Sequence, residues 1–147
     1  MALGTDAIRQ AAVIPVMGGK LCLVTSSSGK RWVIPKGRME PGKTAGEIAL
    51  QEAWEEAGLT GTLSPEPVGS YIYEKAGLTC HVIVFLLHVT QVLDDFPERG
   101  VRERIWLTNA QVHDRIEDPG LRELLRRVVG TGYKTLAGER RGALPSV

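Results

Sequence analysis

Short apolar runs rich in β-branched residues predict a sheet of several strands. Ala11–Met17 and Lys20–Thr25 are separated by Gly18-Gly19, a pair typical of a two-residue hairpin turn. Arg31–Ile34 predicts a brief strand that ends at Pro35. Further strands are predicted at Val68–Tyr73, Thr79–Val92 and Arg102–Leu107, with Gly77 at the turn between the first two. The almost unbroken apolar run from 79 to 92 predicts a strand at the centre of the sheet.

Two segments carry helical spacing. Thr44 and Glu47 match the capping box and Gly58 is a natural C-terminal stop, which predicts a helix over Ala45–Ala57. Its apolar stripe is expected to pack against the sheet and consists of Leu50, Ala53, Trp54 and Ala57. A second helical stripe follows Pro119-Gly120 and comprises Leu121, Leu124, Leu125, Val128 and Val129. Lys36–Lys43 is expected to be irregular loop, and residues 130–147 a loosely ordered tail.

Length and composition indicate a single globular domain over residues 1–147. The 147 residues include 43% hydrophobic positions, enough for one core. The formal charge of +1 gives no bulk field that would favour nucleic-acid or membrane binding, so an anion site must be local. Cys22 and Cys80 both lie in apolar runs and are expected to be buried thiols. Without a signal peptide or a spanning segment, a cytoplasmic enzyme is expected.

The candidate chemistry is a group of three carboxylates on the predicted 45–57 helix. At 100° per residue, Glu52, Glu55 and Glu56 fall within an arc of roughly 100° on one side of the helix. Their mutual repulsion and their place in the C-terminal half of the helix are both unfavourable. A divalent cation such as Mg²⁺ would reverse both penalties. Taken alone, the three residues are better explained as a solvated acidic face, because charge runs are most often merely solvated.

The setting of these carboxylates decides between the two interpretations. The segment KGRMEPGKTAGEIALQEAWEEAGL, residues 36–59, resembles the signature of the Nudix hydrolase family. The matching positions are Gly37, Glu52, Ala53, Glu55, Glu56, Gly58 and Leu59. The resemblance implies an α/β/α sandwich, in which a mixed sheet is flanked by the signature helix and a C-terminal helix. It also implies metal-dependent water attack on a phosphoanhydride bond.

The resemblance implies a role for each acidic residue. Glu52 and Glu56 would bind Mg²⁺, with Mn²⁺ as an alternative, together with the backbone carbonyl of Lys36. Glu55 would be the general base, although in the family this role also falls to the position of Glu52 or to a later loop. Glu98 and Glu103 are candidates for such a loop carboxylate. Two positions depart from the signature, since Lys43 replaces its first Glu and Gln51 replaces its Arg.

Beyond the signature, the chain is similar to one branch of the family, the diphosphoinositol polyphosphate and diadenosine polyphosphate phosphohydrolases. The similarity runs from about Arg9 to the last helix and includes LVTSSSGKRW and VLDDFPERGVRERIW. It implies a set of substrate-binding residues, Arg9, Ser26, Ser27, Ser28, Arg31, Lys75 and Arg102. Arg and Lys suit such a ligand because each phosphate is charged and Arg presents a planar fork to it. Lys36-Gly37-Arg38 departs from the glycine run of that branch.

Several alternatives stay open. ADP-ribose, a nucleoside triphosphate and an RNA 5′ end are further substrate candidates beside the two favoured classes, and a non-catalytic nucleotide-binding module is a further function. Apart from such an RNA end, a small-molecule partner is expected, with no membrane and no nucleic acid. Trp32, Tyr71 and Tyr73 could stack on a base, but aromatic residues on strands more often belong to a core. His81 and His88 fall on opposite faces of a strand, and His113 stands alone, so none predicts a metal site.

Overall fold

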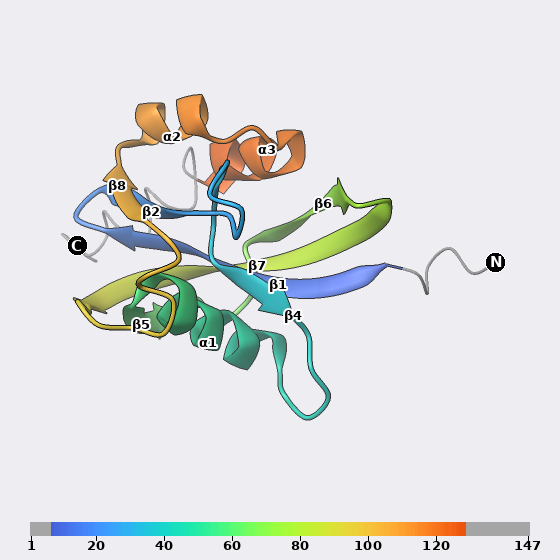
Figure 1. Cartoon of the computed structure of the whole chain (residues 1–147), viewed down its shortest axis with the longest axis horizontal. Helices are drawn as coiled ribbons and strands as arrows, with labels where there is room; N and C mark the ends of the chain where they lie inside the picture. The colour runs from blue at the N-terminus through green and yellow to red at the C-terminus, as the bar shows by residue number, and fades with distance from the viewer. Residues whose placement is uncertain (1–6, 129–147) are drawn as a thin grey trace.

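The computed structural model describes residues 7–128, which form one mixed sheet with helices on both faces (Figure 1). The strands are β1 (Ile8–Met17), β2 (Lys20–Thr25), β3 (Trp32–Val33), β4 (Lys36–Arg38), β5 (Leu59–Leu63), β6 (Gly69–Lys75), β7 (Leu78–Val92) and β8 (Arg104–Leu107). The helices are α1 (Ala45–Ala57), α2 (Asn109–Arg115) and α3 (Pro119–Arg127). The predicted loose tail, 130–147, and Val129 lie outside the described residues.

Strands β1 and β7 form the centre of the sheet. They run parallel from Ile8 opposite Cys80 to Val16 opposite His88, whereas all other neighbouring strands are antiparallel. The main path is β3-β2-β1-β7-β5, with β4 on β1, β6 on β7 and β8 on β2. The prediction of a mixed sheet between the 45–57 helix and a C-terminal helix is therefore confirmed.

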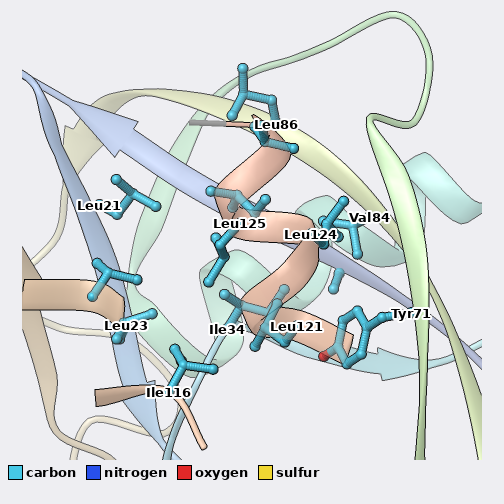
Figure 2. Close-up of a cluster of buried hydrophobic side chains, with 14 of the residues drawn as sticks. Leu21, Leu23, Ile34, Tyr71, Val84, Leu86, Ile116, Leu121, Leu124 and Leu125 are labelled. Atoms are coloured by element: carbon cyan, nitrogen blue, oxygen red, sulfur yellow. The ribbon is translucent and has the colours of Figure 1, made fainter. Parts of the chain in front are cut away.

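Each face of the sheet carries its own core because successive side chains of a strand point to opposite faces. On one face Ile14, Val84 and Leu86 pack against Leu121 and neighbouring residues of α3 (Figure 2). On the other face Ala11, Val13 and Leu87 pack against α1. Helix α1 and helix α3 are thereby held on opposite sides of β1 and β7.

The helix predicted over Ala45–Ala57 is present with both predicted caps. Thr44 and Glu47 form the complete capping box, and Gly58 adopts a left-handed conformation with φ of 69°. Its predicted apolar stripe is only half right, since Ala53 and Ala57 are buried but Leu50 and Trp54 are 38% and 43% exposed. The buried side consists of Ile48, Ala49, Ala53, Glu56 and Ala57. Three alanines on this side let the helix approach the sheet closely, and the larger Leu and Trp side chains lie outside the contact.

Other predictions need correction. Lys36–Arg38, expected within an irregular loop, forms β4 and pairs with β1 through Ala12 opposite Lys36. The sequence reading also missed β5, a short strand containing a glycine, and α2, a helix of seven residues. In these short segments, pairing with a neighbouring strand or a local cap outweighs weak sequence periodicity.

Among residues 7–128, no helix combines the length and the apolar character needed to cross a membrane.

Gly58 provides a test of the side-chain packing at the C-terminal end of α1. We expect Gly58→Ala to lower the free energy of unfolding by more than the roughly 1 kcal/mol that a left-handed alanine costs. The added methyl would overlap the ring of Phe96 and crowd the guanidinium of Arg104. Gly29→Ala is the matched control, because Gly29 has φ of 77° but open space around it. Urea unfolding should show the larger loss at position 58, and equal losses would contradict the packing described here.

Candidate functional site

Glu52 and Glu56 form a carboxylate pair on adjacent turns of α1. Glu56 is 6% exposed and Glu52 is half-buried, so both carboxyl groups have little access to water. Burial raises the pKa of Glu52 to about 8, with further contributions from the hydrogen bond to Glu56 and from the charges of Glu56 and Glu55. The pKa of Glu56 is also raised by burial, although Arg102 opposes the shift. Without a further cation, the surroundings therefore disfavour the ionised form of both carboxyl groups.

Strand β4 lies directly against this pair. The backbone N–H of Lys36 donates to Glu56 Oε1 at 3.2 Å. Gly37 faces α1, and a side chain at this position would overlap the carboxylate of Glu52. The glycine is therefore required by the close approach of Glu52 to the β4 backbone. The recorded contact is made by the Lys36 N–H, and the role of its carbonyl group as a metal ligand stays a prediction.

The loop between β7 and β8 supplies Arg102, the cation that contacts Glu56 directly. Arg102 Nη2 lies 3.3 Å from Glu56 Oε2, and its Nε donates to Glu98 Oε1 at 2.6 Å. Arg102 Nη1 also donates to the Thr25 carbonyl oxygen at 2.8 Å. The loop is joined to α1 by the Glu98 N–H, which donates to the Glu55 carbonyl oxygen. Glu98 thus lies in the site, whereas Glu103 contributes its backbone N–H to the Thr25 hydroxyl.

The two residues that depart from the signature are hydrogen-bonded to each other, and one of them, Gln51, is hydrogen-bonded to Glu55. Lys43 Nζ donates to Gln51 Oε1 at 2.7 Å, and Gln51 Nε2 donates to Glu55 Oε2 at 2.8 Å. The two substituted residues thus give the Glu55 carboxylate a neutral hydrogen-bond donor, the Gln51 amide, which Lys43 holds from its other end.

A cavity of about 200 Å³ opens beside Glu56. Six of the predicted substrate residues line it, namely Ser26, Ser27, Ser28, Arg31, Lys75 and Arg102. Lys36, Gln10 and Tyr73 complete the lining. Burial lowers the pKa of Lys36, and the nearby Arg31, Lys75 and Arg102 lower it further while Glu56 opposes them. Four cationic side chains around one cavity that contains a single carboxylate make it suited to an anion.

Arg9 is not brought into this cavity. It is exposed on β1 and alternates with Gln10, which faces the cavity, so Arg9 projects to the α1 side. Gln10 and the side chain of Lys36 were missed by sequence reasoning. A polar Gln10 just before the apolar residues of β1 is the signal that could have identified the first of them.

The three candidate aromatic residues line the same small recess, and the rings of Tyr71 and Tyr73 stack with their centroids 6.0 Å apart. Tyr71 is buried in the core against α3. Trp32 borders this recess of about 20 Å³, which lies next to the main cavity, and the Arg115 guanidinium lies 6.0 Å from the Trp32 ring centroid. Tyr73 lines the cavity itself, where its hydroxyl donates to Gln10 Oε1 at 2.8 Å and Lys36 Nζ lies 5.4 Å from its ring centroid.

The donor set fits a hard divalent cation. Glu52 and Glu56 offer carboxylate oxygens whose negative charge is poorly solvated, and the β4 backbone lies beside them. Within residues 7–128, no three His, Cys, Asp or Glu side chains are grouped closely enough to hold a metal ion by themselves. The remaining ligands would therefore come from the backbone, water and substrate oxygens, a pattern that Mg²⁺ favours.

The Arg102–Glu56 contact gives a testable consequence for stability. Both side chains are largely buried, at 13% and 8% exposure, so Arg102→Met should leave an uncompensated carboxylate. In metal-free buffer we expect the free energy of unfolding to fall by about 3 kcal/mol. Urea titrations of this variant should be compared with Arg99→Met, which removes an exposed guanidinium from the same loop and should change stability by less than about 0.5 kcal/mol.

The double variant Arg102→Met/Glu56→Gln should recover much of the loss, because the unpaired charge is then absent. A loss that persists in full in the double variant would show that the ion pair does not carry the effect.

Comparison with known proteins gives the same fold and names a family. Nudix hydrolase 12, mitochondrial, of Arabidopsis thaliana is 38% identical over 97 residues, which cover 60% of this chain and 48% of that protein. Diphosphoinositol polyphosphate phosphohydrolase 2 of Mus musculus is 35% identical over 101 residues, which cover 67% and 53%. This chain thus spans about half the length of these two relatives. A solved Nudix hydrolase from Nitrosomonas europaea superposes with a TM-score of 0.70 at 20% identity, covering 86% of this chain and 90% of that one.

The match is not restricted to the acidic helix. The NUDIX domain model matches residues 7–128, from the start of β1 to the end of the described chain. On this evidence, the protein belongs to the Nudix hydrolase family.

Proposed function

We propose that this protein hydrolyses a phosphoanhydride bond of a polyphosphorylated substrate with the help of Mg²⁺. The observation that carries the proposal is the poorly solvated Glu52–Glu56 pair, of which Glu56 lines a cavity that it shares with four cations. These cations are Arg31, Lys36, Lys75 and Arg102. A carboxylate pair suits a divalent cation, and the basic side chains suit phosphate oxygens. The hydrolase names of the relatives support the reaction class.

The proposed metal ligands are Glu52, Glu56 and the backbone carbonyl of Lys36. When bound, Mg²⁺, or Mn²⁺ in its place, would neutralise charge on the phosphoryl oxygens and acidify a bound water. The Lys36 N–H holds Glu56 in place through its oxygen Oε1, and Gly37 leaves room for Glu52. Arg102 contacts Glu56 and also lines the cavity. Its guanidinium can therefore leave the carboxylate of Glu56 and bind a phosphate group of the substrate instead.

We assign the general base to Glu55. Its carboxylate is oriented by Gln51, and the amide of Gln51 is in turn held by Lys43. Glu52 is the alternative on the same helix, and Glu98 is the alternative from the loop, although its carboxylate is engaged by Arg102. A base must accept a proton in the reaction, and the neutral amide of Gln51 constrains Glu55 without supplying a competing positive charge.

The favoured substrates are a diadenosine polyphosphate or a diphosphoinositol polyphosphate. Three serines and four cations around one cavity offer many donors to a run of phosphates. The mouse relative is named for diphosphoinositol polyphosphate, which supports the second class. ADP-ribose, nucleoside triphosphates and an RNA 5′ end remain in the set to be assayed. The expected cytoplasmic location stays a prediction, and the Arabidopsis relative is named as mitochondrial.

The reaction is tested by assaying phosphate or nucleotide release from these substrate classes with Mg²⁺ and with a chelator. We expect metal-dependent turnover, and a reduction of at least about 100-fold in kcat for Glu55→Gln and for Glu56→Gln. Glu66→Gln removes an exposed carboxylate from the loop before β6 and should leave kcat unchanged.

Unchanged turnover in Glu55→Gln would remove its proposed role and direct attention to Glu52 and Glu98. Tight binding of a substrate without metal-dependent turnover of any would instead establish the alternative, a nucleotide-binding module.

A further inference from the structure

A second cavity of about 210 Å³ adjoins the first at the outer end of the sheet. Its lining includes Arg38 and Lys75, the polar side chains of Gln10 and Tyr73, and the apolar side chains of Ile8 and Leu78. Gln10, Tyr73 and Lys75 line both cavities. The two spaces therefore meet at the Tyr73–Gln10 hydrogen bond, and Lys75 borders each of them.

Strand register explains why these side chains come together. Ile8 and Gln10 alternate with Arg9 on β1, and Gln10 pairs with Arg38 on β4. Lys36 and Arg38 are two residues apart on β4, so both point to the same face, with their Cα atoms about 7 Å apart. Lys36 lines the first cavity and Arg38 lines the second. The face that carries the α3 core further along the strands thus ends in a row of polar and basic side chains.

The charged side chains that line the second cavity are both positive. Arg38 and Lys75 are exposed cations, and no carboxylate lines this space within residues 7–128. Glu74, the adjacent acidic residue of β6, accepts a hydrogen bond from the Thr79 hydroxyl and points to the opposite face of the hairpin. The Tyr73 hydroxyl donates to Gln10 Oε1, which leaves the amide N–H groups of Gln10 as donors for an anion.

We propose that this second cavity binds a phosphoryl group of the substrate beyond those held in the first cavity. Arg38 and Lys75 would contact it, and the Gln10 amide would bridge the two subsites. The proposal rests on the proposed function, since it extends the same polyphosphate site. The second cavity would make the protein prefer ligands whose phosphates reach past Lys36 to Arg38. Arg38, which lies on β4 and not on the acidic helix α1, would determine this preference.

Calorimetric binding of inorganic pyrophosphate and tetrapolyphosphate tests the proposal, at a fixed excess of free Ca²⁺ in place of Mg²⁺ so that the ligands are not hydrolysed during the titration. The wild-type protein should bind tetrapolyphosphate about tenfold more tightly than pyrophosphate, which corresponds to about one added charge-assisted contact. Arg38→Gln should remove most of this difference and leave pyrophosphate affinity within about twofold. Lys75→Gln should weaken both ligands, because Lys75 lines both cavities.

Arg122→Gln is the matched control, since Arg122 is an exposed cation of α3 that lines neither of the two cavities, and it should change neither affinity. Thermal unfolding of each variant would show that the fold is kept. The second subsite would be refuted if Arg38→Gln bound both ligands with wild-type affinity, or if it lost affinity for both ligands by the same factor.

The outcome is separate from that of the proposed function. Turnover on any substrate, together with unchanged length dependence in Arg38→Gln, would refute the second subsite alone. Length-dependent binding that needs Arg38, without turnover on any substrate, would refute the hydrolase and keep the subsite.

Discussion

The site depends on keeping two carboxylates close together in a poorly solvated place. Glu56 is buried on the side of α1 that packs against the sheet, and Glu52 lies beside it. Such a pair is unfavourable unless cations or hydrogen-bond donors compensate it. The Lys36 N–H and the Arg102 guanidinium provide part of that compensation. The raised pKa values of both carboxyl groups indicate that a further positive charge is favoured there.

The architecture around the pair follows from this requirement. Ala49, Ala53 and Ala57 bring α1 close to the sheet, and the absence of a side chain at Gly37 lets β4 approach Glu52. The basic and polar lining of the cavity comes from the end of β1, from β4 and β6, and from the loops that carry residues 26–31 and Arg102. The acidic and basic halves of the site thus come from opposite sides of one sheet and meet at β4 and the Arg102 loop.

Much of this arrangement could be predicted from the sequence, for reasons that differ by element. The capping box at Thr44, the stop at Gly58 and the long apolar run of β7 are local signals, and each predicted its element well. The buried side of α1 was misjudged because side-chain size does not reveal which face approaches the sheet closely. Strand β4 was missed because its pairing with β1 is a tertiary contact. The hydrogen bonds from Lys43 to Gln51 and from Gln51 to Glu55 were also missed. The sequence shows Lys43 and Gln51 only as two separate departures from the signature and does not show that their side chains meet.

The central claim is that Glu52, Glu56 and the Lys36 carbonyl group form one metal site. Crystals soaked in Mn²⁺ and measured at a wavelength with strong anomalous scattering from manganese test it directly. The account predicts an anomalous peak within coordination distance, about 2.0 to 2.3 Å, of oxygens from all three residues. A peak elsewhere, or full manganese occupancy that leaves the Glu56–Arg102 pair intact and both carboxylates uncoordinated, would contradict it.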